Sequence, residues 1–368
     1  MRAVRVVRPL FVVAVATALV AGLVGGLLRA GVAWPVLLVF PWHGAAVNAH
    51  AALMVCGFLG TVIGIERAVA VRQRWAFAAP FASGAAAVAT LLGAPGGAAL
   101  LFLLAALVFV AVNLLIVRRQ TAAHTVLLLI AAVAWLVGNA LTALRGGGDA
   151  AIAWWFAFVV LTIAAERLEM TRLMRRHPAA QPAFFAIVAL LLVGAAATLP
   201  APALGGLLYG AALAALALWL LAFDIARRTV HAHGLSRYMA LCLLGGHAWL
   251  LVAGLAWGAT ALGAPARDIA LHALGLGFVL AMVMGHAPVI LPAVARVKLQ
   301  FGWPFYAPLA LLHASLVWRF AGGALDASAR AHGAAANALA IGLFALTALG
   351  AIVAWRRLHP ERVAPRTG

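Results

Sequence analysis

Residues 97–119 read GAALLFLLAALVFVAVNLLIVRR, with no charged side chain before Arg118 and Arg119. A helix of about 20 apolar residues spans the roughly 30 Å hydrocarbon core of a bilayer. The stretch therefore predicts a transmembrane helix that ends at a basic loop.

The same pattern of apolar run and polar gap recurs along the whole chain. The predicted helices cover about 9–31, 46–71, 75–94, 97–117, 122–144, 149–172, 182–199, 204–228, 236–258, 268–292, 303–322 and 334–357. With 67% hydrophobic and 9% charged residues, the composition excludes a soluble globular domain. We predict an all-α polytopic membrane protein of about twelve transmembrane helices, in one bundle domain over residues 1–368.

Basic residues are distributed unequally between the two sides of this arrangement. If the first helix enters from the cytoplasm, 21 of the 26 lysine and arginine residues fall in cytoplasmic gaps or termini. Cytoplasmic loops carry such an excess, so both termini are predicted to be cytoplasmic. The net charge of +18 is spread over many loops with no contiguous basic face. A lipid bilayer is therefore the expected partner, and nucleic acid is not.

Histidines carry most of the candidate chemistry. Those inside apolar runs are His50, His247, His272, His286 and His313. A buried ionisable side chain is costly in lipid and indicates a functional site. Acidic residues are missing from the middle of the apolar runs, which disfavours a carboxylate proton relay. Imidazoles without carboxylates suit iron or copper.

His50 and His272 form the first candidate site. Each lies four residues after the predicted outer start of its helix, roughly 6 Å deep at 1.5 Å per residue. Two neutral imidazoles at one depth on facing helices are what axial ligation of a haem requires. The glycines expected to let the backbone recede for a flat macrocycle are Gly57, Gly60, Gly275 and Gly277.

His286 is a further cofactor-binding candidate. It lies 14 residues after His272, a rise of roughly 21 Å that returns to the same helix face. Mid-membrane histidines on the flanking helices suggest a copper site, although each could instead donate a hydrogen bond to a carbonyl group. The candidate metal ligands are His247, His313, Met282, Met284 and, on the outer side, His43.

Two helices end in the same dipeptide. Glu66-Arg67 closes the second predicted helix, and Glu166-Arg167 lies near the end of the sixth. This echo indicates either a duplication, with halves of about 1–177 and 178–368, or ion pairs that anchor helix ends. With a proline-interrupted tenth helix, it keeps open the alternative of a twelve-helix secondary transporter.

Two segments resemble a known family. Residues 42–44 and 48–54, leading into 57–60, are similar to the Trp-His-Ala-His-Glu-Met opening of the second helix in NnrS proteins. Residues 271–275, leading to Gly285-His286, resemble the His-Ala-Leu helix and later Gly-His of that family. The chain departs from the pattern at the family glutamate, replaced here by alanine, and in the longer interval before Gly-His.

The resemblance implies a protein of the bacterial inner membrane that contains haem and copper and responds to nitric oxide. His50 and His272 would be the haem ligands, and His286 a further metal-site residue. The haem is expected to be b-type, and copper is a second candidate cofactor. The expected partners are a diatomic ligand and an electron donor. Whether the protein is an enzyme stays open.

Subunit I of the haem–copper oxidases is a more distant resemblance, with twelve helices and haem histidines on the second and tenth. That family takes copper ligands from its sixth and seventh helices. Here the corresponding ranges, 149–172 and 182–199, contain no histidine. Terminal oxidase or nitric oxide reductase activity is therefore not expected.

Overall fold

The structure is a computed structural model that describes residues 2–171, 178–295 and 297–359. Within these ranges 85% of the chain is helical and no strand occurs. The helices of the first half are α1 (Arg2–Arg29), α2 (Pro35–Leu38), α3 (His43–Asn48), α4 (His50–Ala52), η1 (Leu53–Gly60), α5 (Thr61–Val71), η2 (Trp75–Phe77), α6 (Ala78–Leu91), α7 (Pro95–Arg119), α8 (Ala123–Arg145) and α9 (Asp149–Met170). Those of the second half are α10 (Ala180–Ala197), α11 (Pro202–Phe223), α12 (Ala226–Thr229), α13 (Gly234–Ala261), α14 (Arg267–His272), η3 (Ala273–Leu280), α15 (Ala281–Ala295), η4 (Trp303–Phe305), α16 (Tyr306–Val317), η5 (Trp318–Gly322) and α17 (Ala327–Leu358).

Helical segments occur in every predicted range, and the all-helical fold class is confirmed. Ten of the described helices are long and apolar enough to cross a membrane. Lipid offers no hydrogen-bond partners for backbone N–H and C=O groups, and a helix pairs these groups within itself. Such apolar runs are therefore stable in a membrane only as helices. The chain thus has the helices of a multi-pass membrane protein, while the full count of twelve stays a prediction.

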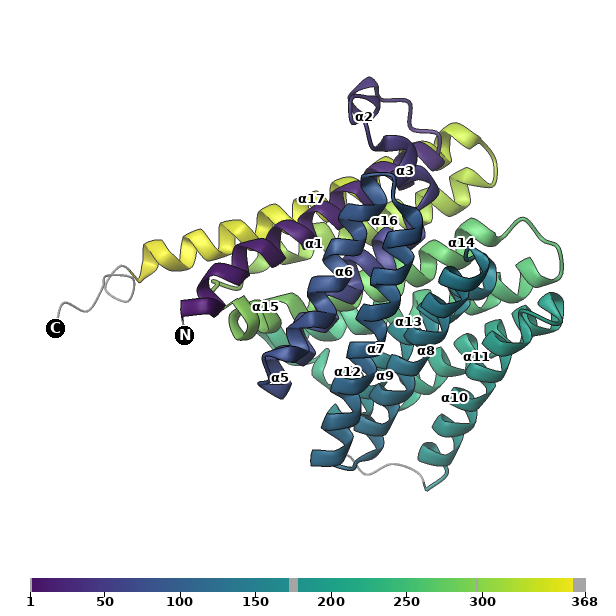
Figure 1. The fold of residues 1–368 in the computed structure, drawn as a ribbon, viewed down its shortest axis with the longest axis horizontal. Coiled ribbons are helices and arrows are strands. Elements are labelled where there is room, and N and C mark those ends of the chain that lie inside the picture. The colour runs from purple at the N-terminus through teal and green to yellow at the C-terminus, as the bar shows by residue number, and fades with distance from the viewer. Residues whose placement is uncertain (1, 172–177, 296, 360–368) are drawn as a thin grey trace.

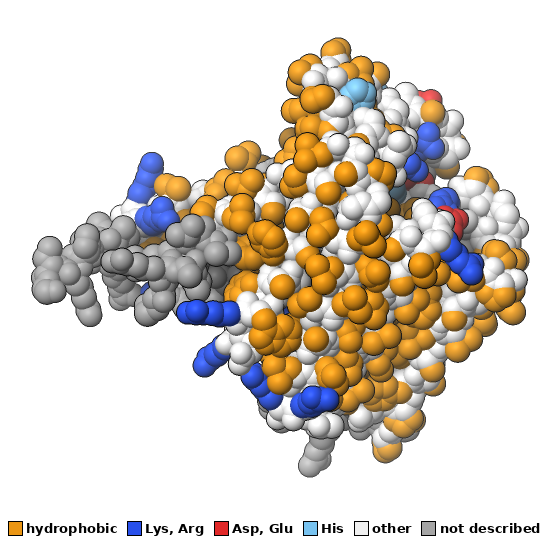
Figure 2. Space-filling model, viewed as in Figure 1, with side chains coloured by type: hydrophobic (Ala, Val, Ile, Leu, Met, Phe, Trp, Pro, Cys, Tyr) orange, Lys and Arg blue, Asp and Glu red, His pale blue; other side chains and the backbone are white. Residues whose placement is uncertain are grey.

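Neighbours in sequence pack as antiparallel pairs, and α1 lies beside α17 (Figure 1). The space-filling view shows hydrophobic side chains over most of one face. Arginine and lysine side chains gather along its lower left edge, and a mixed group of charges lies at the upper right (Figure 2). This is the surface expected of a bundle whose flank contacts lipid and whose ends contact water.

Three helical units form the centre of the bundle. α9 contacts both η1 and η3, and α5 contacts α15. Of the candidate spans, α9 is the most enclosed, with 78% of its most apolar window buried. The continuous units α4–η1–α5 and α14–η3–α15, together with α9, therefore line the axis of the molecule.

Two of the central units contain π-helix where a regular α-helix was expected. η1 begins three residues after His50, and η3 begins immediately after His272. π-helical turns are rare and occur often at functional sites. Pro288 and Pro292, which the sequence suggested as a break, lie inside α15, which continues to Ala295. The irregular part of this helix is the π segment upstream of both prolines.

Glycine allows close packing between α11 and α13. A Cβ atom built on Gly210 would lie 2.6 Å from the Gly254 carbonyl oxygen, and one on Gly254 would lie 2.5 Å from the Ala214 nitrogen. Only the absence of side chains permits this approach, as in many membrane helix pairs. Cys56 and Cys242 are both buried and free.

Candidate functional site

The rings of His50 and His272 lie side by side at one end of the central helices, which we call the histidine end. Their centroids are 6.2 Å apart, with an angle of 25° between the ring planes. The equal depths inferred from the sequence therefore correspond to real proximity across α4 and α14.

His50 is held against α1. Its Nδ1 lies 2.7 Å from the carbonyl oxygen of Gly22, one turn from Gly26. A Cβ atom on Gly26 would lie 2.7 Å from the His50 Cε1, so the ring occupies space that only glycine leaves open. With Nδ1 as the hydrogen-bond donor, Nε2 carries the lone pair, which is the tautomer that a metal-binding histidine requires.

His272 is held by its own helix. Its Nδ1 lies 3.0 Å from the Asp268 carbonyl oxygen and 3.0 Å from the Asp268 Oδ1. A carboxylate behind Nδ1 fixes the orientation and tautomer of a ligating histidine in many metal sites. The i, i+4 spacing places Asp268 directly behind the ring on the same helix face.

Arg319, from η5, completes the surroundings of His272. Its Nε and Nη2 donate to the two carboxylate oxygens of Asp268 at 2.9 and 2.7 Å. Nη2 also lies 3.2 and 3.3 Å from the two ring nitrogens of His272. With Nδ1 donating to Asp268, the ring nitrogen that can accept from Arg319 is Nε2, at 3.3 Å. A metal could therefore bind His272 Nε2 only after the Arg319 Nη2 atom moved away.

Arg319 is itself held in place by contacts with α17. The residue is 6% exposed, and its Nη1 lies 3.5 Å from Asn337 Oδ1 on α17. A Cβ atom on Gly333 would lie 2.5 Å from the Arg319 Cα, so α17 touches η5 through bare backbone. The Asn337 amide in turn donates to Ser315 Oγ at 2.7 Å. This chain of contacts ties α14, η5 and α17 together behind one histidine.

Three of the glycines predicted to make room for a macrocycle have another role. A Cβ atom on Gly60 would lie 2.6 Å from the Trp135 ring, and one on Gly277 would lie 2.4 Å from Trp249. Gly57 faces Ala87 and Ala18. These positions seat side chains of other helices, so that prediction was wrong for them. Gly275 meets only the Phe156 ring, at 3.6 Å.

His286 lies at the opposite end, which we call the glutamate end, where α5 and α9 finish. Its Nδ1 donates to the Met282 carbonyl oxygen at 2.7 Å, and its Nε2 accepts from Arg167 Nη2 at 2.8 Å. Both ring nitrogens are therefore engaged. A metal could bind here only after Arg167 moved away.

The two Glu-Arg dipeptides meet beside His286. Arg67 Nη2 donates to Glu166 Oε1 at 2.8 Å and to Glu66 Oε1 at 3.2 Å. The echo in the sequence is thus a contact between α5 and α9, which agrees with ion pairs that anchor helix ends.

The remaining candidate metal ligands point in different directions. His247 is fully buried, with its ring 6.4 Å from Phe278, whereas His313 Nδ1 accepts from Trp249 Nε1 at 2.8 Å. His313 packs on Gly245 of α13, and residues two apart on a helix face roughly opposite sides, so His247 points away from it. Met282 packs on Gly246.

Met284 is buried in a separate cluster with Tyr238, Cys242 and Phe305. His43 Nδ1 lies 2.8 Å from the carbonyl oxygen of Phe40, beyond the histidine end. Among residues 2–171, 178–295 and 297–359, no three His, Cys, Asp or Glu side chains are close enough to hold one metal ion. The only candidate ligands that the structure brings together are His50 and His272.

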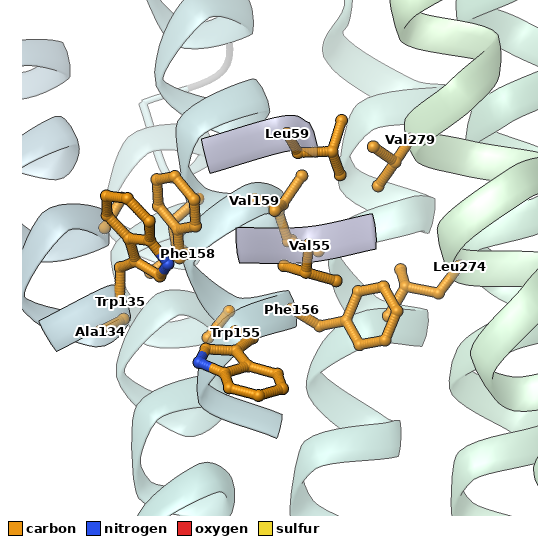
Figure 3. Close-up of a cluster of buried hydrophobic side chains, with 14 of the residues drawn as sticks. Val55, Leu59, Ala134, Trp135, Trp155, Phe156, Phe158, Val159, Leu274 and Val279 are labelled. Carbon is orange, nitrogen blue, oxygen red and sulfur yellow. The ribbon is translucent and has the colours of Figure 1, made fainter. Parts of the chain in front are cut away.

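An apolar layer separates the two ends of the central helices. Its members are Val55, Leu59, Phe156, Val159, Leu274 and Val279, which point toward one another from η1, α9 and η3 (Figure 3). In sequence, each lies between the histidine end and the glutamate end of its helix. The layer therefore divides the axis into two polar sites.

Sequence reasoning missed Asp268, Arg319 and Asn337. The i, i+4 spacing of Asp268 and His272 was a usable signal. For Arg319 the signal was a charged residue inside a predicted helix. Its partner could not be deduced, because that requires knowing that η5 lies beside α14.

Comparison with known proteins gives one assignment. A family model described as "Domain of unknown function (DUF8744)" matches residues 7–353. No curated protein matches the chain. No solved structure matches it either.

Proposed function

We propose that this chain, which belongs to the DUF8744 family, is an inner-membrane protein that holds a haem between His50 and His272 and acts in the response to nitric oxide. The observation that supports it is the ring pair 6.2 Å apart, with Nδ1 of each histidine engaged with oxygen atoms of the chain. Two imidazoles that bind one metal through Nε2 at roughly 2 Å each have centroids about 6 Å apart. The resemblance to NnrS proteins points to the same residues.

Such a haem supplies an iron that passes electrons or binds a diatomic molecule. The residues of the chain set the ligand geometry. Asp268 holds the His272 ring in the tautomer with Nε2 unprotonated, and Arg319 holds Asp268. His50 is held by a single carbonyl group on α1, so it is the less constrained of the two ligands.

The test is a visible absorption spectrum of detergent-purified protein from haem-replete cells, oxidised and reduced. We expect a Soret band that His50→Ala or His272→Ala abolishes. His313→Ala is the matched control, because His313 is a partly buried histidine held by Trp249, and the Soret band should persist in this variant. A colourless wild-type preparation without metal by elemental analysis would sink the proposal. The same analysis tests copper as a second cofactor.

The topology belongs to this proposal as well. We propose twelve transmembrane helices with both termini and the glutamate end in the cytoplasm, as the basic residues indicate. A periplasmic reporter enzyme inserted at Gly147, in the turn between α8 and α9, should be active. The same reporter fused after residue 368 should be inactive. The reverse result would invert the topology.

A secondary transporter is the second candidate. The observation in its favour is that polar clusters lie at both ends of the three central helices, with the apolar layer between them (Figure 3). Alternating access requires two such ends and a barrier between them. A colourless preparation with intact folding would favour this reading over the haem protein.

A further inference from the structure

A cluster of ionisable side chains occupies the glutamate end of the central helices. We call it the Glu–Arg–His cluster, and its members are Glu66, Arg67, Glu166, Arg167, Asp224, His247 and His286. They come from α5, α9, the residue after α11, α13 and α15. Ionisable groups within membrane helices are costly and mark ion or proton pathways.

The cluster is graded from partly exposed to buried. The side chains of Glu66 and Glu166 are 29% and 27% exposed, and that of Arg67 between them is 13% exposed. Arg167 is 5% exposed and His247 is fully buried. Solvent at the glutamate end therefore reaches the two carboxylates first.

Arg67 is shared by two carboxylates. Its Nη2 lies 2.8 Å from Glu166 and 3.2 Å from Glu66, both through Oε1. One guanidinium can hold two carboxylates, or one carboxylate beside a neutral carboxyl group. The two carboxyl groups can therefore carry no proton or one proton while Arg67 still bridges them.

The cluster contains buried nitrogens without hydrogen-bond partners. Within the described part of the chain, both ring nitrogens of His247 and the Nε atoms of Arg67 and Arg167 have none. His247 Nε2 lies 4.0 Å from Asp224 Oδ2, beyond direct hydrogen-bond range. Buried polar groups are usually satisfied by ordered water when protein atoms do not reach them. Ordered water at His247 and Arg167 would connect these buried nitrogens to the carboxylates.

We propose that the Glu–Arg–His cluster is a proton-exchange site, loaded from solvent at the glutamate end through Glu66 and Glu166. On loading, a hydronium ion gives its proton to one carboxylate. An O–H bond forms, water is released, and the charge of the cluster rises by one with no electron transfer. The other carboxylate keeps its pair with Arg67, and water links the pair to the buried nitrogens.

The apolar layer sets the direction of exchange. The side chains of Val55, Leu59, Val159, Leu274 and Val279 offer no hydrogen-bonding atom, so a proton on the cluster cannot continue along them toward His50 and His272. Exchange therefore takes place at one end only. The site does not depend on a cofactor at the histidine end.

His286 interacts electrostatically with Glu66, and the other charged groups acting on His286 are Arg167 and Asp224. His124 on α8 pairs with Glu169 on α9. His124 Nε2 lies 3.9 Å from Glu169 Oε1, and the Glu169 side chain is 39% exposed. Glu169 lies three residues after Glu166 on the same helix but is outside the cluster. It is therefore the matched control.

The experiment is infrared spectroscopy of the full chain in lipid, titrated from alkaline to acid pH in H2O and in D2O. We expect a carboxyl C=O band that appears on acidification and shifts promptly in D2O, as a hydrated carboxyl group does. Glu66→Gln and Glu166→Gln should each remove a component of this band that persists in Glu169→Gln, because the exposed Glu169 carboxyl group titrates as a separate component.

Two results would overturn the proposal. One is a band that persists in both glutamine variants. The other, measured on the wild type alone, is a carboxyl region that contains only the component of exposed groups such as Asp149 and Glu169, with no further component that shifts promptly in D2O. The second result is decisive even if the variants do not fold.

Discussion

Arg319 forms a two-point ion pair with Asp268, four residues before His272, although the two charges lie 51 positions apart in the sequence. The Arg319 side chain is 6% exposed and that of Asp268 is 33% exposed. The pair therefore joins η5 to α14 where the histidine ring needs support.

Arg319→Ala should destabilise the protein by about 3 kcal/mol, because it leaves a partly buried carboxylate without its partner. The measurement is the unfolding midpoint in detergent. Arg330→Ala, at an exposed position on α17, should change stability by less than about 0.5 kcal/mol. Equal midpoints for the two variants would contradict the assigned role of Arg319.

If His272 binds haem, Arg319→Ala should also lower haem affinity by roughly 10–100-fold, as the loss of groups behind a metal ligand usually does. The measurement is haem titration of the folded apoprotein. Arg330→Ala again serves as the control. If the destabilised Arg319→Ala variant bound haem with unchanged affinity, the ion pair would contribute to folding and not to haem binding.

Gly26→Ala should displace the His50 ring, because the new Cβ atom would lie 2.7 Å from Cε1. We expect the ratio of Soret to protein absorbance to fall while the protein still folds. Gly342→Ala is the matched control, since no atom lies within 4 Å of a Cβ atom there. That substitution should stabilise its helix by up to about 1 kcal/mol.

Arg67 and Glu166 should be energetically coupled across α5 and α9. In a double-mutant cycle of Arg67→Ala and Glu166→Ala, we expect a coupling energy of about 1 kcal/mol from unfolding midpoints. The same cycle with Glu169→Ala in place of Glu166→Ala should give a value near zero. Coupling to both glutamates alike would show that the effect is not specific to the 2.8 Å contact.

Asp326 should make the start of α17 sensitive to pH. Its carboxylate accepts from the Ser328 and Ala329 backbone nitrogens at 3.2 and 3.3 Å, and the hydrogen bonds from Ser328 lower its pKa. A lowered pKa means that the cap contributes stability at neutral pH and loses it only as pH falls through the lowered value. The protection of the Ser328 and Ala329 amides from hydrogen exchange, relative to the intrinsic rate at each pH, should therefore hold at neutral pH and fall only at acid pH. In Asp326→Asn this dependence on pH should disappear.

The sequence predicts the helices well because apolar length is a local property. The proximity of His50 and His272 was also predictable, since it follows from counting residues along helices of the predicted direction. Other contacts between helices were not predictable. The copper hypothesis placed His247 with His313 by depth alone, yet the two lie on different sides of α13.

The π-helical segments have a consequence for the angular relation between the two ends of α4–η1–α5 and of α14–η3–α15. A π turn holds more residues than an α turn, so η1 and η3 offset every residue that follows them. Deleting one residue from η1 would restore regular α-helix and rotate Glu66 by roughly 100° relative to His50. The azimuth at which Glu66, Arg67 and His286 meet the axis thus depends on these segments, whereas that of Glu166 on the regular helix α9 does not.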